Sequence, residues 1–216
     1  MVINMKKLVN KLAGGTPSIM GQENLLVSAV LLPLVEVDGV TAILFEVRSM
    51  LLHRQPGEIC FPGGRVERHE LDNPANTAVR ETAEELGLQC NDIKLLAPMN
   101  FMVTPMGTIT YPYVGYITSP ERIKPSREEV DSTFTVPLAF LTAYQPQTSM
   151  VDVATRLIGD FPLHRVPEPY RQGWHKRWSF PTYIYEYGDY FIWGMTAIIL
   201  HHFLDTYSNY FPQALD

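Results

Sequence analysis

The segment from residue 73 to residue 88 constrains the fold most, because it carries helix signals at both ends and along its length. Asn73 favours the position just before a helix, and the ring of Pro74 suits the first helical turn. The apolar side chains within the segment recur at helical spacing: Ala75, Val79, Ala83 and Leu86. Gly87 stands where a helix ends with a left-handed residue. We therefore expect a helix with one apolar face.

Apolar runs on both sides of this helix predict β-strands. Residues 25–37 and 40–47 are joined by Asp38-Gly39, a pair that favours a tight hairpin turn. Further strands are expected at residues 59–61, 93–103, 109–118 and 178–187, and further helices at residues 3–13, 137–144 and 193–207. The proline-rich stretch 145–173 is expected to be a loop or insert. Strands mixed with helices predict an α/β fold, with residues 1–216 as a single domain built on a mixed sheet.

Composition narrows the class of function. The net charge of -6 argues against a nucleic-acid groove, and an anionic substrate would need cations placed locally. Cys60 and Cys90 match neither a disulfide framework nor a zinc site, and they suit a reducing compartment. No stretch is long and apolar enough to span a bilayer. We therefore expect a cytoplasmic protein that acts on a small molecule, with neither nucleic acid nor a membrane as its partner.

Three glutamates share one face of the expected helix. Glu81, Glu84 and Glu85 are spaced i, i+3 and i+4, and each such like-charged pair costs about 0.2–0.5 kcal/mol. A divalent cation reverses the sign of this interaction, since Mg²⁺ and Mn²⁺ prefer oxygen ligands. The alternative is a solvated acidic face on which Arg80 pairs with Glu84. The turn Pro62-Gly63-Gly64 favours the metal site, because its backbone can approach a ligand closely.

These residues resemble the Nudix box. The matching segments are Phe61-Pro62-Gly63-Gly64 and Arg80-Glu81-x-x-Glu84-Glu85-x-Gly87-Leu88. The general box also has a glutamate between them, and Asp72 stands at that position before the arginine. The glycine pair lies two residues further upstream than in the general box.

The resemblance implies a Nudix α/β/α sandwich and a metal-dependent hydrolase. It implies that Glu81, Glu84, Glu85 and the Gly63 carbonyl hold Mg²⁺ or Mn²⁺. It also implies that Arg80 orients the glutamates and that Glu81 assists deprotonation of the attacking water.

The residues before the glycine turn resemble a second motif, which is found in coenzyme A diphosphatases. Leu44-Phe45-Glu46-Val47-Arg48-Ser49, His53, Gly57 and Phe61-Pro62-Gly63-Gly64 follow its spacing. Phe45 and Glu46 replace a leucine and a threonine of the motif, and His53 replaces an arginine. This resemblance implies hydrolysis of coenzyme A or acyl-coenzyme A to 3′,5′-ADP and (acyl-)4′-phosphopantetheine.

The expected substrate-binding residues surround this loop: Arg48, His53, Arg54, Gly57, Phe61 and Arg65. Glu129 resembles a further acid of the subfamily and is a candidate ligand or base, although a solvated glutamate is the alternative. Two other functions stay open, namely hydrolysis of ADP-ribose or dinucleotides and a non-catalytic nucleotide-binding regulator. Nudix enzymes often dimerise, so a homodimer is also expected, although the sequence shows no interface.

Overall fold

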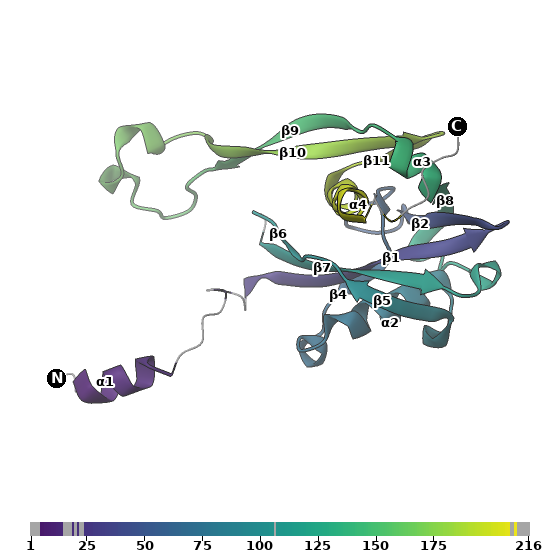
Figure 1. Ribbon diagram of the computed structural model, residues 1–216. Helices are drawn as coiled ribbons and strands as arrows, with labels where there is room; N and C mark the ends of the chain where they lie inside the picture. Colours follow the sequence, from purple (N-terminus) through teal and green to yellow (C-terminus); the bar gives the residue numbers. More distant parts are fainter. Residues whose placement is uncertain are drawn as a thin grey trace.

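A mixed β-sheet lies between two helices in this computed structural model, which describes residues 5–14, 19, 21, 24–105, 107–207 and 210. Helix α2 (Pro74–Leu86) covers one face of the sheet and helix α4 (Gly194–Tyr207) covers the other (Figure 1). The expected α/β/α sandwich with a mixed sheet is confirmed.

The sheet has eight strands. They are β1 (Leu26–Val37), β2 (Val40–Arg48), β3 (Ile59–Cys60), β4 (Gly63–Arg65), β5 (Ile93–Pro98), β6 (Met102–Val103), β7 (Thr108–Ile117) and β8 (Val130–Pro137). The path runs β3-β2-β1-β7-β5, with β4 on β1, β6 on β7 and β8 on β2. Strands β1 and β7 are parallel, and the other pairs are antiparallel. The predicted hairpin β1–β2 is confirmed, whereas the predicted strand 93–103 is two strands, β5 and β6.

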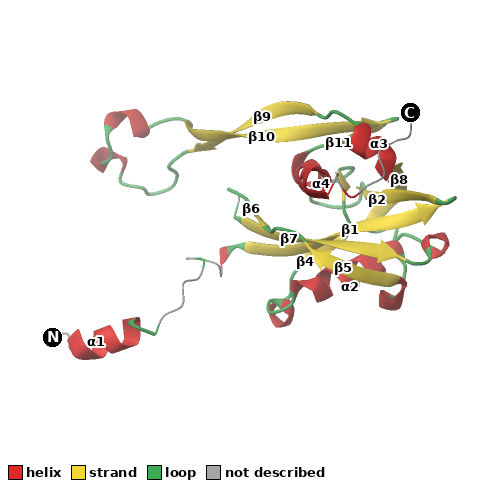
Figure 2. Ribbon diagram, viewed as in Figure 1, coloured by secondary structure: helices red, strands yellow, loops and turns green. Residues whose placement is uncertain are grey.

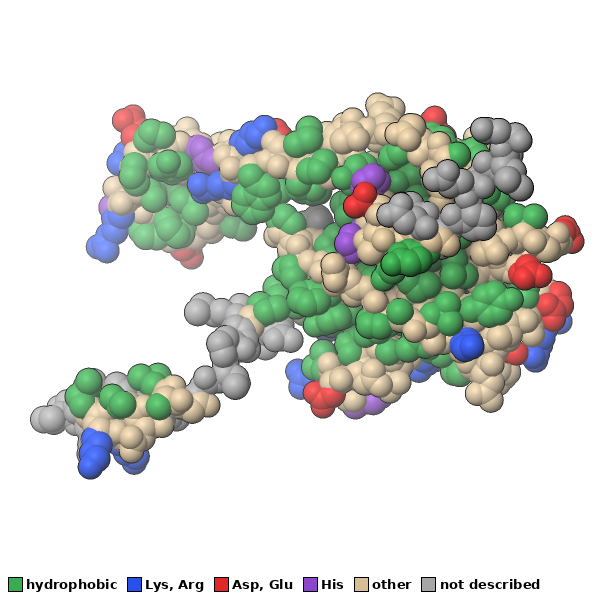
Figure 3. Space-filling view, viewed as in Figure 1, with side chains coloured by type: hydrophobic (Ala, Val, Ile, Leu, Met, Phe, Trp, Pro, Cys, Tyr) green, Lys and Arg blue, Asp and Glu red, His purple; other side chains and the backbone are tan. Residues whose placement is uncertain are grey.

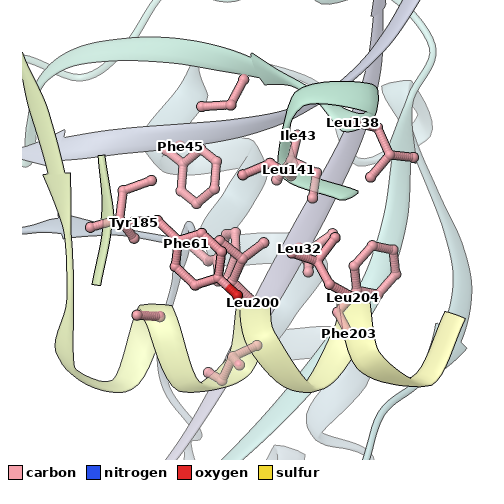
Figure 4. Packing of buried hydrophobic residues seen from close by; sticks show 14 of the residues in the cluster. Leu32, Ile43, Phe45, Phe61, Leu138, Leu141, Tyr185, Leu200, Phe203 and Leu204 are labelled. Atoms are coloured by element: carbon pink, nitrogen blue, oxygen red, sulfur yellow. The ribbon is translucent and has the colours of Figure 1, made fainter. Parts of the chain in front are cut away.

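Alternation along β1 and β2 divides the core into two clusters. In β1, Ala29 and Leu31 face α2, whereas Leu32 faces α4. Side chains of a strand point alternately to opposite faces, so both faces of this central strand are covered. Figure 4 shows the α4 side, where Phe45 and Phe61 of the sheet region pack toward Leu200. The sheet is therefore buried on both faces around the segment that leads to the glycine turn.

A second, three-stranded sheet departs from the sequence prediction. It consists of β9 (Gln147–Thr155), β10 (His175–Tyr187) and β11 (Tyr190–Ile192). Strands β9 and β10 form a long hairpin that projects from the body of the molecule and ends in helical turns (Figure 2). Residues 145–173 were expected to be a loop or insert, and the structure shows that this stretch contains the regular strand β9. Its residues are mostly exposed on both faces, so no alternation of burial marks the strand.

The remaining helices are short. Helix α1 (Met5–Leu12) corresponds to the helix expected at residues 3–13, of which residues 3 and 4 lie outside the described part of the chain. Helix α3 (Leu138–Ala143) follows β8, as expected. Short 3₁₀ helices lie at Arg68–Glu70, Cys90–Asp92, Pro120–Arg122, Leu163–Arg165 and Glu168–Tyr170. None of the helices in the described residues is long and apolar enough to cross a membrane.

Candidate active site

Helix α2 presents its three glutamates at graded depths. Its end is fixed by Gly87, whose φ of 66° is the left-handed angle that glycine accepts without strain. Glu85 is 4% exposed, whereas the side chains of Glu81 and Glu84 are 20% and 59% exposed. The acidic face of the helix therefore runs from the protein interior to solvent.

The glycine turn lies directly against two of these glutamates. The backbone N–H of Gly63 donates a hydrogen bond of 2.8 Å to Glu85 Oε2. A Cβ atom added at Gly64 would lie 2.4 Å from Cδ of Glu81. A Cβ at Gly63 would lie 2.3 Å from the carbonyl oxygen of Ala29, and Gly63 has a φ of 150°. Both positions therefore need glycine: a side chain at Gly63 would clash with the backbone of β1, and one at Gly64 would clash with the Glu81 carboxylate.

Arg80 links the exposed glutamates to a buried acid. Its Nη1 donates to Glu81 Oε1 at 2.8 Å and to Glu84 Oε2 at 3.3 Å. Its Nη2 donates to Glu70 Oε2 at 3.0 Å, and the hydroxyl of Thr77 donates to the same oxygen at 2.8 Å. The bond from Arg80 is the largest of the effects that lower the pKa of Glu70 to about 2. Glu70 therefore holds the guanidinium that holds Glu81 and Glu84.

The acid before the helix is Glu70 and not Asp72. Asp72 was expected at the position of the Nudix-box glutamate, but its side chain is exposed. Glu70 is 7% exposed and receives both Thr77 and Arg80. The Arg80–Glu84 pair of the solvated-face alternative does form, as one of the three carboxylate contacts of Arg80.

Glu46 is a functional candidate that the sequence analysis missed. Its side chain lies on the face of β2 that packs toward α2, and the residue is 1% exposed. The thiol of Cys60 donates to Glu46 Oε1 at 3.1 Å, while Glu46 Oε2 is buried without a hydrogen-bond partner among the described residues. Burial raises the pKa of Glu46, and both burial and the Glu46 carboxylate raise that of Glu85. A glutamate within the apolar run 42–47 of β2 was the signal that could have found it.

Glu129 lies on a loop that is tied to both α2 and β2. The N–H of Ser126 donates to the carbonyl of Glu85 at 2.9 Å, and the N–H of Ser49 donates to the carbonyl of Glu129 at 2.8 Å. The charge of Glu129 contributes to the raised pKa values of Glu46, Glu81 and Glu85. Five carboxylates therefore form one group, called the acidic cluster below: Glu46, Glu81, Glu84, Glu85 and Glu129.

The acidic cluster suits a hard divalent cation. Its donors are carboxylates, and the unpartnered oxygen of Glu46 is an orphaned buried acceptor that a cation would satisfy. Among the described residues, no group of three or more His, Cys, Asp or Glu side chains is placed so that it could hold a metal ion by itself. Mg²⁺ does not require one, since it usually keeps several waters and uses one or two carboxylates together with substrate phosphates.

Five of the six expected substrate-binding residues divide into three groups. Arg48 ends β2 beside the acidic cluster, where its charge lowers the pKa of Glu46. Its Nε is buried without a hydrogen-bond partner in the described chain. Arg65 of β4 is exposed one residue after the glycine turn. His53, Arg54 and Gly57 are exposed in the loop between β2 and β3, and no described contact brings them to the acidic cluster.

Phe61 was expected to contact substrate, and this expectation is corrected. Its side chain is 4% exposed, and its ring stacks on that of Phe45 with centroids 5.0 Å apart. The alternation around the glycine turn points this ring into the α4 side of the core (Figure 4). Phe61 therefore anchors the turn from within.

A glycine turn packed on an acidic helix, at the edge of an α/β/α sandwich, defines a class of hydrolase fold. This chain belongs to the Nudix family, because the NUDIX domain matches residues 35–152, more than half of the 216 residues.

Two curated relatives are informative. Mitochondrial coenzyme A diphosphatase NUDT8 of Homo sapiens is 32% identical over 80% of this chain and 65% of that protein. Peroxisomal coenzyme A diphosphatase NUDT7 of Mus musculus is 34% identical over 63% of this chain and 56% of that protein. The chain thus spans less than two thirds of the length of each. Among solved structures, a MutT/nudix family protein from Enterococcus faecalis has a TM-score of 0.48 and 15% identity, covering 96% of this chain and 70% of that one.

Proposed function

We propose that this chain hydrolyses the diphosphate bond of coenzyme A or acyl-coenzyme A to 3′,5′-ADP and (acyl-)4′-phosphopantetheine, with Mg²⁺ or Mn²⁺ as cofactor. The acidic cluster supports the hydrolase chemistry most strongly, because a buried oxygen of Glu46 lies near Glu85 without a hydrogen-bond partner among the described residues. The choice of substrate is supported by the motif that spans residues 44–64 and by the names of the two relatives.

The roles proposed for the cluster come from its resemblance to the Nudix box and are supported by its contacts. Glu81, Glu84, Glu85 and the Gly63 carbonyl would hold the cation, and Glu46 joins them as a buried acceptor. When bound, the cation neutralises the diphosphate and acidifies the attacking water. Gly64 fixes the position of the Glu81 carboxylate, and Arg80 fixes its orientation.

Proton transfer is assigned to Glu81, with Glu129 as a second base or ligand. Water adds its oxygen to phosphorus, its proton passes to the carboxylate of Glu81, and the bond between phosphorus and the bridging oxygen breaks. The leaving phosphate takes the electron pair of that bond. Arg48, Arg65, His53 and Arg54 are proposed to balance the charges of the substrate phosphates.

A substrate panel tests the proposal. The purified protein is incubated with Mg²⁺ or Mn²⁺ and coenzyme A, acetyl-coenzyme A, ADP-ribose or NADH, and the products are separated by chromatography. We expect 3′,5′-ADP from the coenzyme A substrates, and a loss of turnover in Glu84→Gln. The matched control is Glu36→Gln, which changes an exposed glutamate of β1 outside the acidic cluster. It should leave turnover unchanged.

Two other outcomes would redirect the assignment. Preferential release of AMP from ADP-ribose or NADH would keep the Nudix chemistry and overturn the coenzyme A substrate. Nucleotide binding without turnover of any substrate would instead make the chain a binding module. The expected homodimer is tested by light scattering of the purified chain, and the expected cytoplasmic location by fractionation of cells that express it.

A further inference from the structure

Residues 156–178 form the end of the β9–β10 hairpin, called the arm tip below, and extend beyond the body of the molecule (Figure 1). Tyr183 of β10 still contacts the body, since its ring stacks on that of His201 in α4 with centroids 3.6 Å apart. Strand β10 begins at His175, eight positions before Tyr183. A strand rises about 3.3 Å per residue, so the start of β10 lies roughly 25 Å further out. The hairpin therefore holds the arm tip well away from the sheet and its two covering helices.

The arm tip exposes large apolar side chains. Trp174 is 67% exposed and Ile158 is 74% exposed. The others of this kind are Phe161, Tyr170 and Trp178. Two of the three tryptophans of the chain thus lie exposed on the arm tip. Tryptophan and tyrosine combine an apolar ring with a polar group, which suits the boundary between water and lipid.

The arm tip is also basic in an acidic chain. It contains four arginines and one lysine against Asp160 and Glu168, which leaves a net charge of +3. The whole chain has a net charge of -6, so the remaining residues carry -9. An anionic surface would attract the arm tip and repel the rest of the chain. The length of the hairpin, roughly 25 Å, exceeds the Debye length of about 8 Å at physiological ionic strength, so this repulsion is largely screened.

The cations and the exposed rings of the arm tip lie side by side. The guanidinium carbon of Arg156 is 5.1 Å from the ring centroid of Trp174, and that of Arg177 is 5.9 Å from the ring centroid of Tyr170. Figure 3 shows this mixture of hydrophobic and basic side chains at the end of the hairpin. A surface of this composition can contact lipid phosphates and the apolar layer beneath them at the same time.

A cavity of about 280 Å³ opens within the arm tip. Phe161, Tyr170, His175 and Arg177 are among the residues that line it. Nε2 of His175 is buried without a hydrogen-bond partner among the described residues. With its proton on Nε2, this imidazole can donate to a phosphate together with the guanidinium of Arg177. The cavity therefore suits the phosphate of a lipid headgroup.

We propose that the arm tip binds the surface of an anionic lipid bilayer, with Trp174 in the interfacial layer and the arginines at the lipid phosphates. Contact of this kind needs no membrane-spanning segment. It departs from the sequence-based expectation that a membrane is not a partner. It is independent of the proposed function, because no step of the hydrolysis uses the arm tip.

The test is cosedimentation of the whole chain with vesicles of phosphatidylcholine, prepared with and without phosphatidylserine. Binding is expected only to the vesicles that contain phosphatidylserine, and it should weaken as salt is added. Arg156→Gln should weaken binding by about fivefold, and Trp174→Ala by about tenfold. The matched controls Lys94→Gln and Trp193→Ala change exposed residues outside the arm tip and should bind as the wild type does. The circular dichroism spectrum of each variant should match that of the wild type.

Three results would overturn the proposal. The first is no binding to vesicles with phosphatidylserine, or equal binding by the wild type, Arg156→Gln and Trp174→Ala. The second is a dimer in light scattering that Trp174→Ala dissociates while vesicles are not bound, which would make the arm tip a contact between copies of this chain. The third is binding of inorganic phosphate in calorimetry without binding of vesicles, which would make the cavity a site for a free anion.

Discussion

Replacing Gly64 by alanine should disable the site while leaving the fold intact. The new Cβ would lie 2.4 Å from Cδ and 2.5 Å from Oε2 of Glu81, whereas ordinary contacts begin at 3.4 Å. The Glu81 carboxylate must therefore move by about 1 Å. The backbone of Gly64 lies outside the left-handed region, so alanine introduces no backbone strain there.

The size of the effect follows from that displacement. A misplacement of 1 Å in a catalytic group can lower the rate by about 100-fold. Arg80 holds Glu81 at 2.8 Å and would resist the movement, so the carboxylate cannot swing freely to an equivalent position. The displaced atoms are the end of a flexible side chain, so the free energy of unfolding should change by less than about 1 kcal/mol.

The assay pairs steady-state hydrolysis of coenzyme A with denaturant unfolding of each variant. Gly14→Ala is the matched control, because nothing lies within 4 Å of its new Cβ, and it should change neither quantity. Gly63→Ala should unfold the protein, since its Cβ would lie 2.3 Å from the carbonyl oxygen of Ala29. Activity of Gly64→Ala within about threefold of the wild type would refute the reasoning, because Glu81 would then not need its observed position.

Three further predictions concern single side chains. Glu70→Gln should lower the free energy of unfolding by about 1.5–3 kcal/mol, because a charge-assisted hydrogen bond to Arg80 is lost, while the exposed control Asp72→Asn should change it by less than about 0.5 kcal/mol. The pKa of Glu70 is about 2 in the folded protein and 4.5 for an ordinary glutamate, so this stabilisation is fully present above pH 4.5 and is lost as the pH falls toward 2. The free energies of unfolding of the wild type and Glu70→Gln should therefore converge near pH 2. Glu46→Gln should raise the melting temperature of the metal-free protein, because it removes a buried charge beside Glu85. It should also reduce the increase in melting temperature that Mg²⁺ causes. If calorimetry shows the same Mg²⁺-induced increase in the variant and the wild type, Glu46 is not part of the cation site. Phe61→Ala should destabilise the protein by about 3–5 kcal/mol in denaturant titrations, and a loss of substrate affinity at unchanged stability would restore Phe61 as a contact residue.

The sequence predicted the elements whose signals are local. Helix α2 has its signals within its own residues, from Asn73 to Gly87, and the β1–β2 hairpin has its turn pair at Asp38-Gly39. Strand β9 has no such signal, because it pairs with β10 in a ribbon that is largely exposed, so no row of buried side chains marks it. The single strand predicted at 93–103 is interrupted because β5 and β6 pair with different parts of β7.

The candidate site was also only partly predictable from the sequence. The three glutamates of α2 lie within one helical turn, so their spacing alone placed them on one face. Glu46 comes to Glu85 only through packing of β2 against α2, which no spacing in the sequence encodes. The box position was assigned to Asp72 from the sequence, and Glu70 was not considered. Only burial and the contact of Glu70 with Arg80 distinguish them.

The most direct test of the account is a Mg²⁺ titration of coenzyme A cleavage by the wild type and Glu81→Gln. We expect 3′,5′-ADP release to be absent in chelator, to rise to saturation with Mg²⁺, and to fall by at least about 100-fold in Glu81→Gln. Far-ultraviolet circular dichroism and the melting temperature should show that the variant is folded. Cleavage that persists in chelator, or that a folded Glu81→Gln variant retains in full, would contradict the assignment of the acidic cluster as the metal-dependent catalytic centre.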